Sequence, residues 1–268
     1  RTENFVLKSV SLIEKTQISW YHYNIKRVGE LVGKGMKPLI RLEDDAMKYV
    51  IVDLEMNPVS DEYPNERKVS KLETIQIGAV LLDEKYQEIG SFVTLVKPEY
   101  NIRIQKRYEK LTGIKTSMVE SAPHFKKALD MFFNWCSSIQ DEVQIIQWSE
   151  NDYLQFTREM NMKGILVSEQ NQKYMEHVWL DFQAEYEEVL GLERNISLKD
   201  AIMYAGEDFH GHQHDALVDA RNTACLFGIV RDEEKCEKAL KHVIEVLKPK
   251  TSVSLGDMFD FSGLSLSA

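Results

Sequence analysis

An apolar run that ends in two alternating carboxylates constrains this chain more than any other stretch. Residues 49–52 read Tyr-Val-Ile-Val and are followed by Asp53, Leu54 and Glu55. On a β-strand, alternate side chains point to the same side, so Asp53 and Glu55 project into one place while Leu54 points to the opposite face. Carboxylates this close repel, and one pKa rises unless a cation lies between them. A lone pair of this kind usually just ends a strand at the surface, and both interpretations remain open for this stretch alone.

Two further segments supply carboxylates in similar positions. Residues 143–148 form a second apolar run, and Asp152 lies just past it at the start of a helical pattern. Residues 212–224 (HQHDALVDARNTA) place His214 and Asp219 five apart in an apolar frame. A helix that begins directly after the histidine lets the imidazole and the carboxylate face one cavity. Taken alone, this motif is more often a helix cap and a solvated carboxylate.

The ordered set of four acids and one histidine resembles a known family. It has the order found in the DEDDh branch of the DnaQ-like 3′→5′ exonucleases, and the chain is similar to that branch over about residues 48–231. The third motif of the family, His-x-Ala-x-x-Asp-Ala, is matched by His214, Ala216, Asp219 and Ala220. The resemblance implies an RNase H-like fold, with a catalytic set made of Asp53, Glu55, Asp152, His214 and Asp219.

Within this family the chain is nearest to the Eri-type exonucleases and their bacterial KapD-type relatives. The similarity lies in residues 73–78 (ETIQIG) and residues 97–99 (KPE). Many members have a threonine after the second acid that helps to seat the terminal nucleotide, whereas this chain has Met56. We assign substrate contacts to Leu54 and Met56, and the identity of the polymer stays open.

The resemblance implies metal-dependent hydrolysis of phosphodiester bonds. Two divalent ions per site, Mg²⁺ or Mn²⁺, about 4 Å apart, would activate the attacking water and stabilise the leaving 3′ oxygen. Hard ions prefer oxygen ligands, which fits carboxylates without cysteine. By resemblance, Asp53 bridges both ions and Asp152 supports the second. Glu55 and Asp219 hold the ion that binds the water.

His214 is expected to accept the proton from that water, a role suited to a pKa near 6.5. The nearby carboxylates should keep this pKa near or above 6.5, since they favour the imidazolium unless the metals offset them. The expected reaction releases nucleoside 5′-monophosphates from the 3′ end of single-stranded nucleic acid, with RNA favoured over DNA. His210 and His212 are expected to be solvent-facing loop residues.

Hydrophobic periodicity predicts an α/β fold. Three strands joined by short connections, at residues 49–54, 72–82 and 92–96, should form an antiparallel meander. Two more strands alternate with helices, which gives a five-stranded mixed sheet with helices on both faces. These strands are expected at 143–148 and about 177–180, and helices at 103–111, 125–139, 152–160, 182–190, 198–205, 215–230 and 233–247.

The catalytic domain is expected to span residues 48–248. Residues 1–47 have apolar positions near helical spacing and are predicted to form an N-terminal helical extension. Residues 249–268, rich in Ser and Gly, are predicted to be a flexible C-terminal tail. Either end is a candidate contact for a protein partner. Residues 57–71 form a polar loop that rims the site or is a disordered insertion.

Composition leaves more than one function class open. The formal net charge of −10 is unusual for a protein that binds phosphates, but residues 97–115 carry six basic residues against two acids. Such a patch binds phosphates or is a solvated helix face. No membrane span is expected, and three cysteines without zinc spacing indicate reduced core thiols in a cytoplasmic protein. The alternatives are a catalytically silent binding or regulatory module, an exonuclease directed at DNA, and an enzyme for other phosphodiesters.

Overall fold

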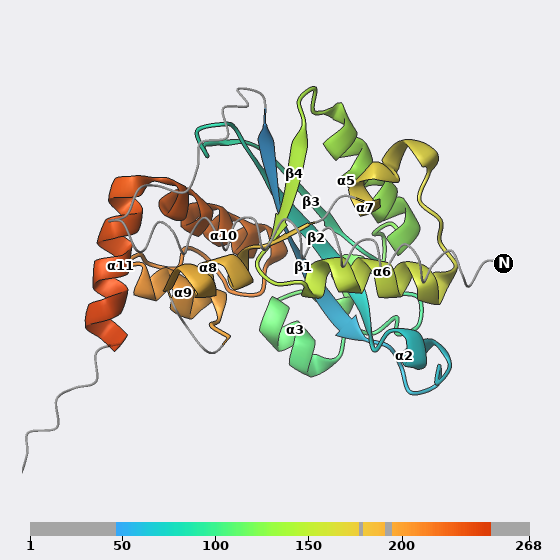
Figure 1. Ribbon diagram of the computed structural model, residues 1–268. Coiled ribbons are helices and arrows are strands. Elements are labelled where there is room, and N and C mark those ends of the chain that lie inside the picture. Colours follow the sequence, from blue (N-terminus) through green and yellow to red (C-terminus); the bar gives the residue numbers. More distant parts are fainter. Residues whose placement is uncertain (1–46, 177–178, 191–194, 248–268) are drawn as a thin grey trace, which may run out of the picture.

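The computed structural model describes residues 47–247, apart from 177–178 and 191–194. The predicted N-terminal helical extension and C-terminal tail, with their suggested protein contacts, lie outside the described residues. A five-stranded sheet with the order β3-β2-β1-β4-β5 forms the centre of the molecule (Figure 1). The predicted mixed sheet is confirmed.

The sheet combines an antiparallel meander with two parallel strands. Its antiparallel part consists of β1 (Lys48–Pro58), β2 (Leu72–Leu82) and β3 (Glu88–Leu95). On the other side, β4 (Val143–Gln147) runs parallel to β1, and β5 (Leu180–Asp181) runs parallel to β4. This arrangement places β1 in the middle, where both of its edges are paired.

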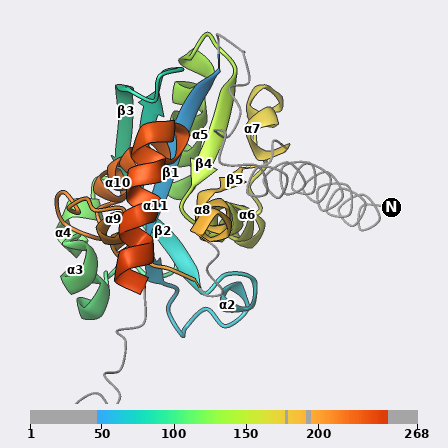
Figure 2. The ribbon, with the colours of Figure 1, turned by 60° about the vertical axis from the view of Figure 1, so that its left-hand side comes forward.

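Helices cover both faces of the sheet, as Figure 1 shows with one group on each side. One face packs against α5 (Phe125–Ser138), α6 (Asn151–Lys163) and α7 (Lys173–Glu176). The other packs against α8 (Phe182–Leu190), α9 (Leu198–Tyr204), α10 (Ala216–Arg231) and α11 (Glu233–Leu247). Short elements complete the described chain: α2 (Glu66–Val69), α3 (Lys106–Thr112), α4 (Thr116–Val119) and the 3-10 turn Glu169–Asn171. Figure 2 shows α3 and α4 together on the side that carries α9 and α10.

The alternation of side chains along β1 decides which residues lie on each face of the sheet. Val50, Val52 and Leu54 lie in the core beneath α5 and α6, whereas Ile51 lies in the core beneath α10. Asp53 and Glu55 share the side of Ile51 and therefore face α10.

β1 continues beyond its predicted end at residue 54. A β-bulge shifts the register after Glu55, so that Glu55 pairs with Gln76 but Met56 pairs with Thr74. The two acids thus lie within a hydrogen-bonded strand and not at its end. Residues 57–71 are ordered and include α2, which contradicts the alternative of a disordered insertion.

Other predicted boundaries differ by a few residues. β3 begins at Glu88 instead of residue 92, because the weak strand formers at 90–91 are paired with β2. α3 begins at Lys106 instead of residue 103 and ends, as expected, at Gly113, whose φ is +73°. None of the helices in the part of the chain that the structure describes is long and apolar enough to cross a membrane.

The three cysteines are free, but only one is a core thiol. Cys136 is buried within the core beneath α5, and burial raises the pKa of its thiol to about 12. Cys225 is exposed and Cys236 is half-buried, so the expectation of core thiols is wrong for these two. Cys225 is on the solvent-exposed side of α10, and Cys236 is on α11 near Tyr186.

The N-terminus of α10 lies directly on β2. A Cβ at Gly78 would come within 2.3 Å of the backbone carbon of Ala216, so the approach requires glycine. Gln76, on the same face of β2, accepts a hydrogen bond from the backbone N–H of Ala216 at 3.0 Å. Asp215 caps the helix by accepting hydrogen bonds from two backbone N–H groups of the first turn. These contacts fix the start of α10 against the sheet.

Gly78→Ala is expected to lower the free energy of unfolding by roughly 1–3 kcal/mol or more, measured by urea denaturation. The new methyl group meets backbone atoms, which cannot rotate away. Gly90→Ala is the matched control, because its nearest neighbours lie 3.8 Å away. It should leave stability unchanged or raise it slightly. Equal effects of the two substitutions on the free energy of unfolding would contradict a close contact between the backbone of α10 and Gly78.

Candidate active site

The structure brings the predicted acids and histidine together beside the start of α10. Asp53 and Glu55 come from β1, Asp152 from the first turn of α6 and Asp219 from the first turn of α10, with His214 in the loop before α10. One carboxylate oxygen each of Glu55 and Asp219 and a ring nitrogen of His214 lie within 4.8 Å of one another. Nδ1 of His214 is 3.9 Å from Oε1 of Glu55.

Asp152 is fixed to β1 by a backbone contact. Its Oδ1 accepts a hydrogen bond from the backbone N–H of Leu54 at 3.2 Å, between the two acids of β1. The side chain of Leu54 is only 5% exposed and lies in the core beneath α5 and α6. Strand alternation turns this side chain away from the acids, so the substrate contact expected of Leu54 stays a prediction that concerns its backbone. Met56 is half-buried and packs against the same core.

His214 is held in an uncommon backbone conformation. Its φ is +64°, in the left-handed region that non-glycine residues rarely adopt. Its backbone N–H donates a hydrogen bond to Oδ2 of Asp219 at 3.1 Å. The preceding loop is fixed by the buried Asn222 of α10, which accepts a hydrogen bond from the N–H of His210 at 3.0 Å and donates one to its carbonyl at 2.9 Å. Strain of this kind requires surroundings that enforce it, and Asp219 and Asn222 provide them.

Burial and the charges of nearby acids raise the pKa of all four carboxyl groups. Burial is the largest cause in each case. The pKa of Asp53 rises well above its usual range, with the charges of Asp152, Glu55 and Asp219 adding to burial. The pKa values of Glu55 and Asp152 rise to about 8, and that of Asp219 rises to about 6.

The four carboxylates fit a site for cations. Oδ1 of Asp219 is buried and makes no hydrogen bond with any described residue. Buried polar atoms are normally satisfied, so an oxygen without a partner next to three other acids favours a positively charged ligand. The donor set is oxygen with one imidazole, which suits a hard divalent ion. Glu55, Asp219 and His214 each offer a ligand atom within 4.8 Å of the other two.

The pKa of His214 is lowered from 6.5, which corrects the expectation that it lies near or above that value. Burial is the larger cause, followed by the charge of His212. The nearest carboxyl group, that of Glu55, has a pKa of about 8 and is protonated in the range where the imidazole titrates. A neutral acid does not hold an imidazolium, so the expected carboxylate effect is missing.

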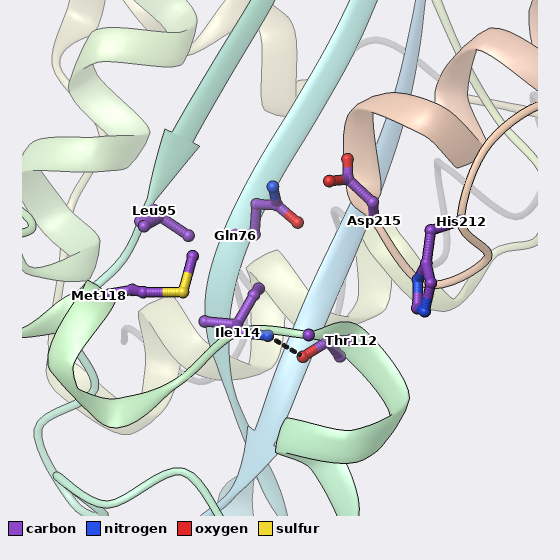
Figure 3. A pocket seen from close by; sticks show the side chains of 8 residues that line it. Gln76, Leu95, Thr112, Ile114, Met118, His212 and Asp215 are labelled. Carbon is purple, nitrogen blue, oxygen red and sulfur yellow. Dashed lines mark hydrogen bonds between the residues drawn. The ribbon is translucent and has the colours of Figure 1, made fainter.

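A cavity of about 260 Å³ opens beside the carboxylates on the same side of the sheet. In Figure 3, the apolar side chains of Leu95, Ile114 and Met118 lie opposite the polar side chains of Asp215 and His212. Its other lining residues are Gln76, Thr112 and Gly113. The expected exposure of His210 and His212 is found, but His212 also lines this cavity.

Several residues that support the site were missed in the sequence. Glu73 accepts three hydrogen bonds from the loop after β3, at 2.7, 2.9 and 2.9 Å, through the backbone N–H groups of Glu99, Tyr100 and Asn101. Gln76 and Gly78 seat α10, and Asn222 fixes the histidine loop. A signal was present for Asn222, since it is a polar residue within the apolar frame of a helix. Residues 73–78 were singled out only for their resemblance to the Eri type, and their structural roles were missed because their partners lie far away in the chain.

Comparison with protein families finds one that covers most of the catalytic domain. The model of the family described as Exonuclease, RNase_T, matches residues 50–227. ERI1 exoribonuclease 2 of Danio rerio is 29% identical over 181 residues, covering 60% of this chain and 32% of that protein. ERI1 exoribonuclease 2 of Mus musculus is 27% identical over 221 residues, covering 75% of this chain and 31% of that protein. The chain thus spans about a third of the length of these curated relatives.

Solved structures share the fold at low sequence identity. The nuclease domain of 3′hExo, a DEDDh family member bound to rAMP, has a TM-score of 0.59 at 19% identity, covering 69% of this chain and 92% of that chain. A 3′-exonuclease in a structure of 3′-end-specific recognition of a histone mRNA stem-loop has a TM-score of 0.57 at 19% identity. The match covers 69% of this chain and 82% of that chain. Escherichia coli exonuclease I in complex with a dA16 oligonucleotide has a TM-score of 0.53 at 14% identity. The match covers 73% of this chain and 42% of that chain. The RNase H-like fold is confirmed.

The metal-free protein is expected to lose stability as the pH rises from about 4 to about 8. The pKa values of Glu55 and Asp152 are about 8 in the folded state, against 4.5 and 3.8 for the free groups. The folded protein therefore binds more protons across this interval, and stability falls with rising pH. Urea midpoints in EDTA at several pH values measure the effect. At the upper end, Mg²⁺ or Mn²⁺ should restore stability by mass action.

Glu55→Gln combined with Asp152→Asn should flatten this pH profile and weaken the effect of the metal. Replacing two exposed acids, Glu62 and Glu120, by glutamine should preserve both. A wild-type midpoint that stays constant in EDTA would contradict the raised pKa values.

Proposed function

Because the chain belongs to the exonuclease (RNase_T) family and, within it, to the DEDDh exonucleases of the Eri type, we propose that it removes nucleotides from the 3′ end of single-stranded RNA in a metal-dependent reaction. The convergence of Asp53, Glu55, Asp152, Asp219 and His214 is the observation that supports this activity. Residues next to this cluster in the chain, His212 and Asp215, line a cavity. All five residues are present, which argues against a catalytically silent binding module.

The four carboxylates are the groups that would hold the metal, and we expect two ions of Mg²⁺ or Mn²⁺. When bound, such ions activate water and stabilise charge on the oxygens of the phosphodiester. The chain contributes a fixed frame for them: Asp53 and Glu55 on a central strand, and Asp152 tied to the backbone of that strand. Asp219 keeps one oxygen for the backbone N–H of His214 and leaves the other unpartnered.

His214 is suited to accept the proton of the attacking water. Its side chain is 46% exposed, and its lowered pKa keeps the imidazole neutral near pH 7. The strained backbone and the loop fixed by Asn222 hold the ring at the edge of the acid cluster. Attack of water on phosphorus breaks the bond to the 3′ oxygen of the preceding nucleotide. The phosphate then leaves with the terminal nucleoside as its 5′-monophosphate.

The cavity beside the acids suits a nucleotide. One wall is apolar, with Leu95, Ile114 and Met118, and the opposite wall carries hydrogen-bonding groups. A nucleobase has an apolar face and polar edges and fits such a lining. RNA is favoured because the curated relatives are exoribonucleases, whereas the exonuclease I structure holds a DNA oligonucleotide on the same fold.

The protein is expected to shorten a 5′-labelled single-stranded RNA stepwise from its 3′ end in Mg²⁺ or Mn²⁺, and EDTA should abolish the reaction. Gel ladders and chromatography of the products measure the direction and the chemistry, with nucleoside 5′-monophosphates expected. The same sequence as DNA tests the choice of polymer. Cleavage of a circular RNA would contradict an exonuclease.

His214→Ala should slow turnover by roughly 10²- to 10⁴-fold, the usual contribution of a positioned base. Metal-induced stabilisation should survive, because the four acids remain. The wild-type rate should rise with pH through a midpoint below 6.5, since the pKa of His214 is lowered. His212→Ala is the matched control and should keep kcat close to wild type. A severe loss in His212→Ala with a mild one in His214→Ala would reverse their assignment.

A further inference from the structure

A group of exposed basic side chains lies next to the cavity. It consists of Arg103, Lys106, Arg107, Lys110 and Lys115, which we call the α3 basic face. Between residues 103 and 115 the only acid is Glu109, so this segment has a local charge of +4 in a chain whose net charge is −10. This short stretch thus concentrates positive charge next to the cavity.

The α3 basic face has no partner within the described ranges 47–176, 179–190 and 195–247. None of its five side chains makes a hydrogen bond or ion pair there, whereas Lys48, Lys163 and Arg231 all pair with carboxylates. Unpaired basic groups on the surface are free to bind an external anion. Leu111 and Met118, at 41% and 46% exposure, interrupt the charges with apolar surface.

The α3 basic face is linked rigidly to the catalytic strand. Asn57, which is fully buried two residues after Glu55, donates hydrogen bonds to the carbonyls of Asn101 at 3.4 Å and Arg103 at 3.2 Å. Its Oδ1 accepts a hydrogen bond from the N–H of Gln105, the N-cap of α3, at 3.0 Å. The start of α3 is therefore fixed relative to the acids.

The other end of α3 leads into the cavity. Thr112, Gly113 and Ile114 lie between Lys110 and Lys115 in the chain and line the cavity wall. Figure 3 shows Thr112 and Ile114 on the side of the cavity formed by this segment, opposite Asp215. A chain that leaves the cavity on this side passes over positive charge, and one that leaves along the acids meets repulsion.

We propose that the α3 basic face binds the sugar-phosphate backbone of the substrate strand on the 5′ side of the nucleotide being removed, the ligand being single-stranded RNA. This inference rests on the proposed function for the position of the 3′ end. The lysine and arginine side chains bind phosphates, and bases lie against Leu111 and Met118. Binding through phosphates carries little sequence preference and weakens with salt.

The test is a triple variant, Lys106→Gln, Arg107→Gln and Lys110→Gln, which removes three charges and keeps good helix formers. With an RNA of roughly twelve nucleotides, KM should rise about tenfold or more at low salt, while kcat stays unchanged. A dinucleotide has no phosphates on the 5′ side of the bond being cleaved, so its turnover should be that of wild type. The slope of log affinity against log salt should become less steep by about 0.7 for each phosphate that the variant no longer binds.

The matched control removes three exposed, unpaired lysines elsewhere: Lys85 in the β2–β3 turn, Lys127 on α5 and Lys238 on α11. Its KM for the longer RNA should stay close to wild type. Equal losses in the two variants would show a general effect of net charge and would overturn the proposal. An unchanged KM in the α3 variant would overturn it as well.

Binding without turnover separates this proposal from the exonuclease activity. Both triple variants are measured in an Asp152→Asn background by fluorescence anisotropy of labelled RNA. Loss of binding in the α3 variant alone supports the surface even if the wild-type protein degrades no RNA. If the wild type degrades RNA and the α3 variant binds and degrades it equally well, the surface is wrong and the exonuclease stands.

Discussion

Repulsion among four carboxylates, two of them buried and two half-buried, is the constraint on which this structure depends. Asp53, Glu55, Asp152 and Asp219 come from three elements, and each raises the cost of ionising its neighbours. Backbone contacts hold them in place, because the N–H groups of Leu54 and His214 donate to two of the acids. Main-chain N–H groups therefore fix the positions of the carboxylates, and a bound cation is needed to compensate their negative charge.

A second buried cluster on α6 shows the opposite solution. Nζ of Lys163 lies 2.8 Å from Glu159, 3.1 Å from Glu73 and 3.0 Å from Glu99. Burial alone would lower the pKa of Lys163, but the carboxylates of Glu159 and Glu73 raise it, so the ammonium stays charged. One end of α6 thus carries carboxylates that pair with a lysine of the same helix. The other end carries Asp152, which belongs to the cluster of four acids. The two clusters differ in whether the chain supplies the positive charge.

Much of the fold followed from the sequence because its signals are local. Strand alternation placed Asp53 and Glu55 opposite Leu54, and helical spacing placed Asp219 in the first turn of α10. The bulge after Glu55 and the role of Gln76 depend on the partner strand and on α10, which the local pattern does not reveal. The substrate contact assigned to Leu54 stays a prediction for its backbone, because strand alternation turns the side chain into the core. The catalytic roles of the acids and the histidine stay predictions.

The contact between Gly78 and the start of α10 consists of main-chain atoms on the α10 side and a missing side chain on the β2 side. Such a contact does not depend on which side chains the α10 residues carry. Substitutions on the other faces of either element leave it intact as long as the path of the backbone is kept. The arrangement of the acids can therefore persist through extensive sequence divergence, which is consistent with a shared fold at 19% identity. Position 78 itself is the exception, since every residue with a Cβ displaces the helix that carries Asp219.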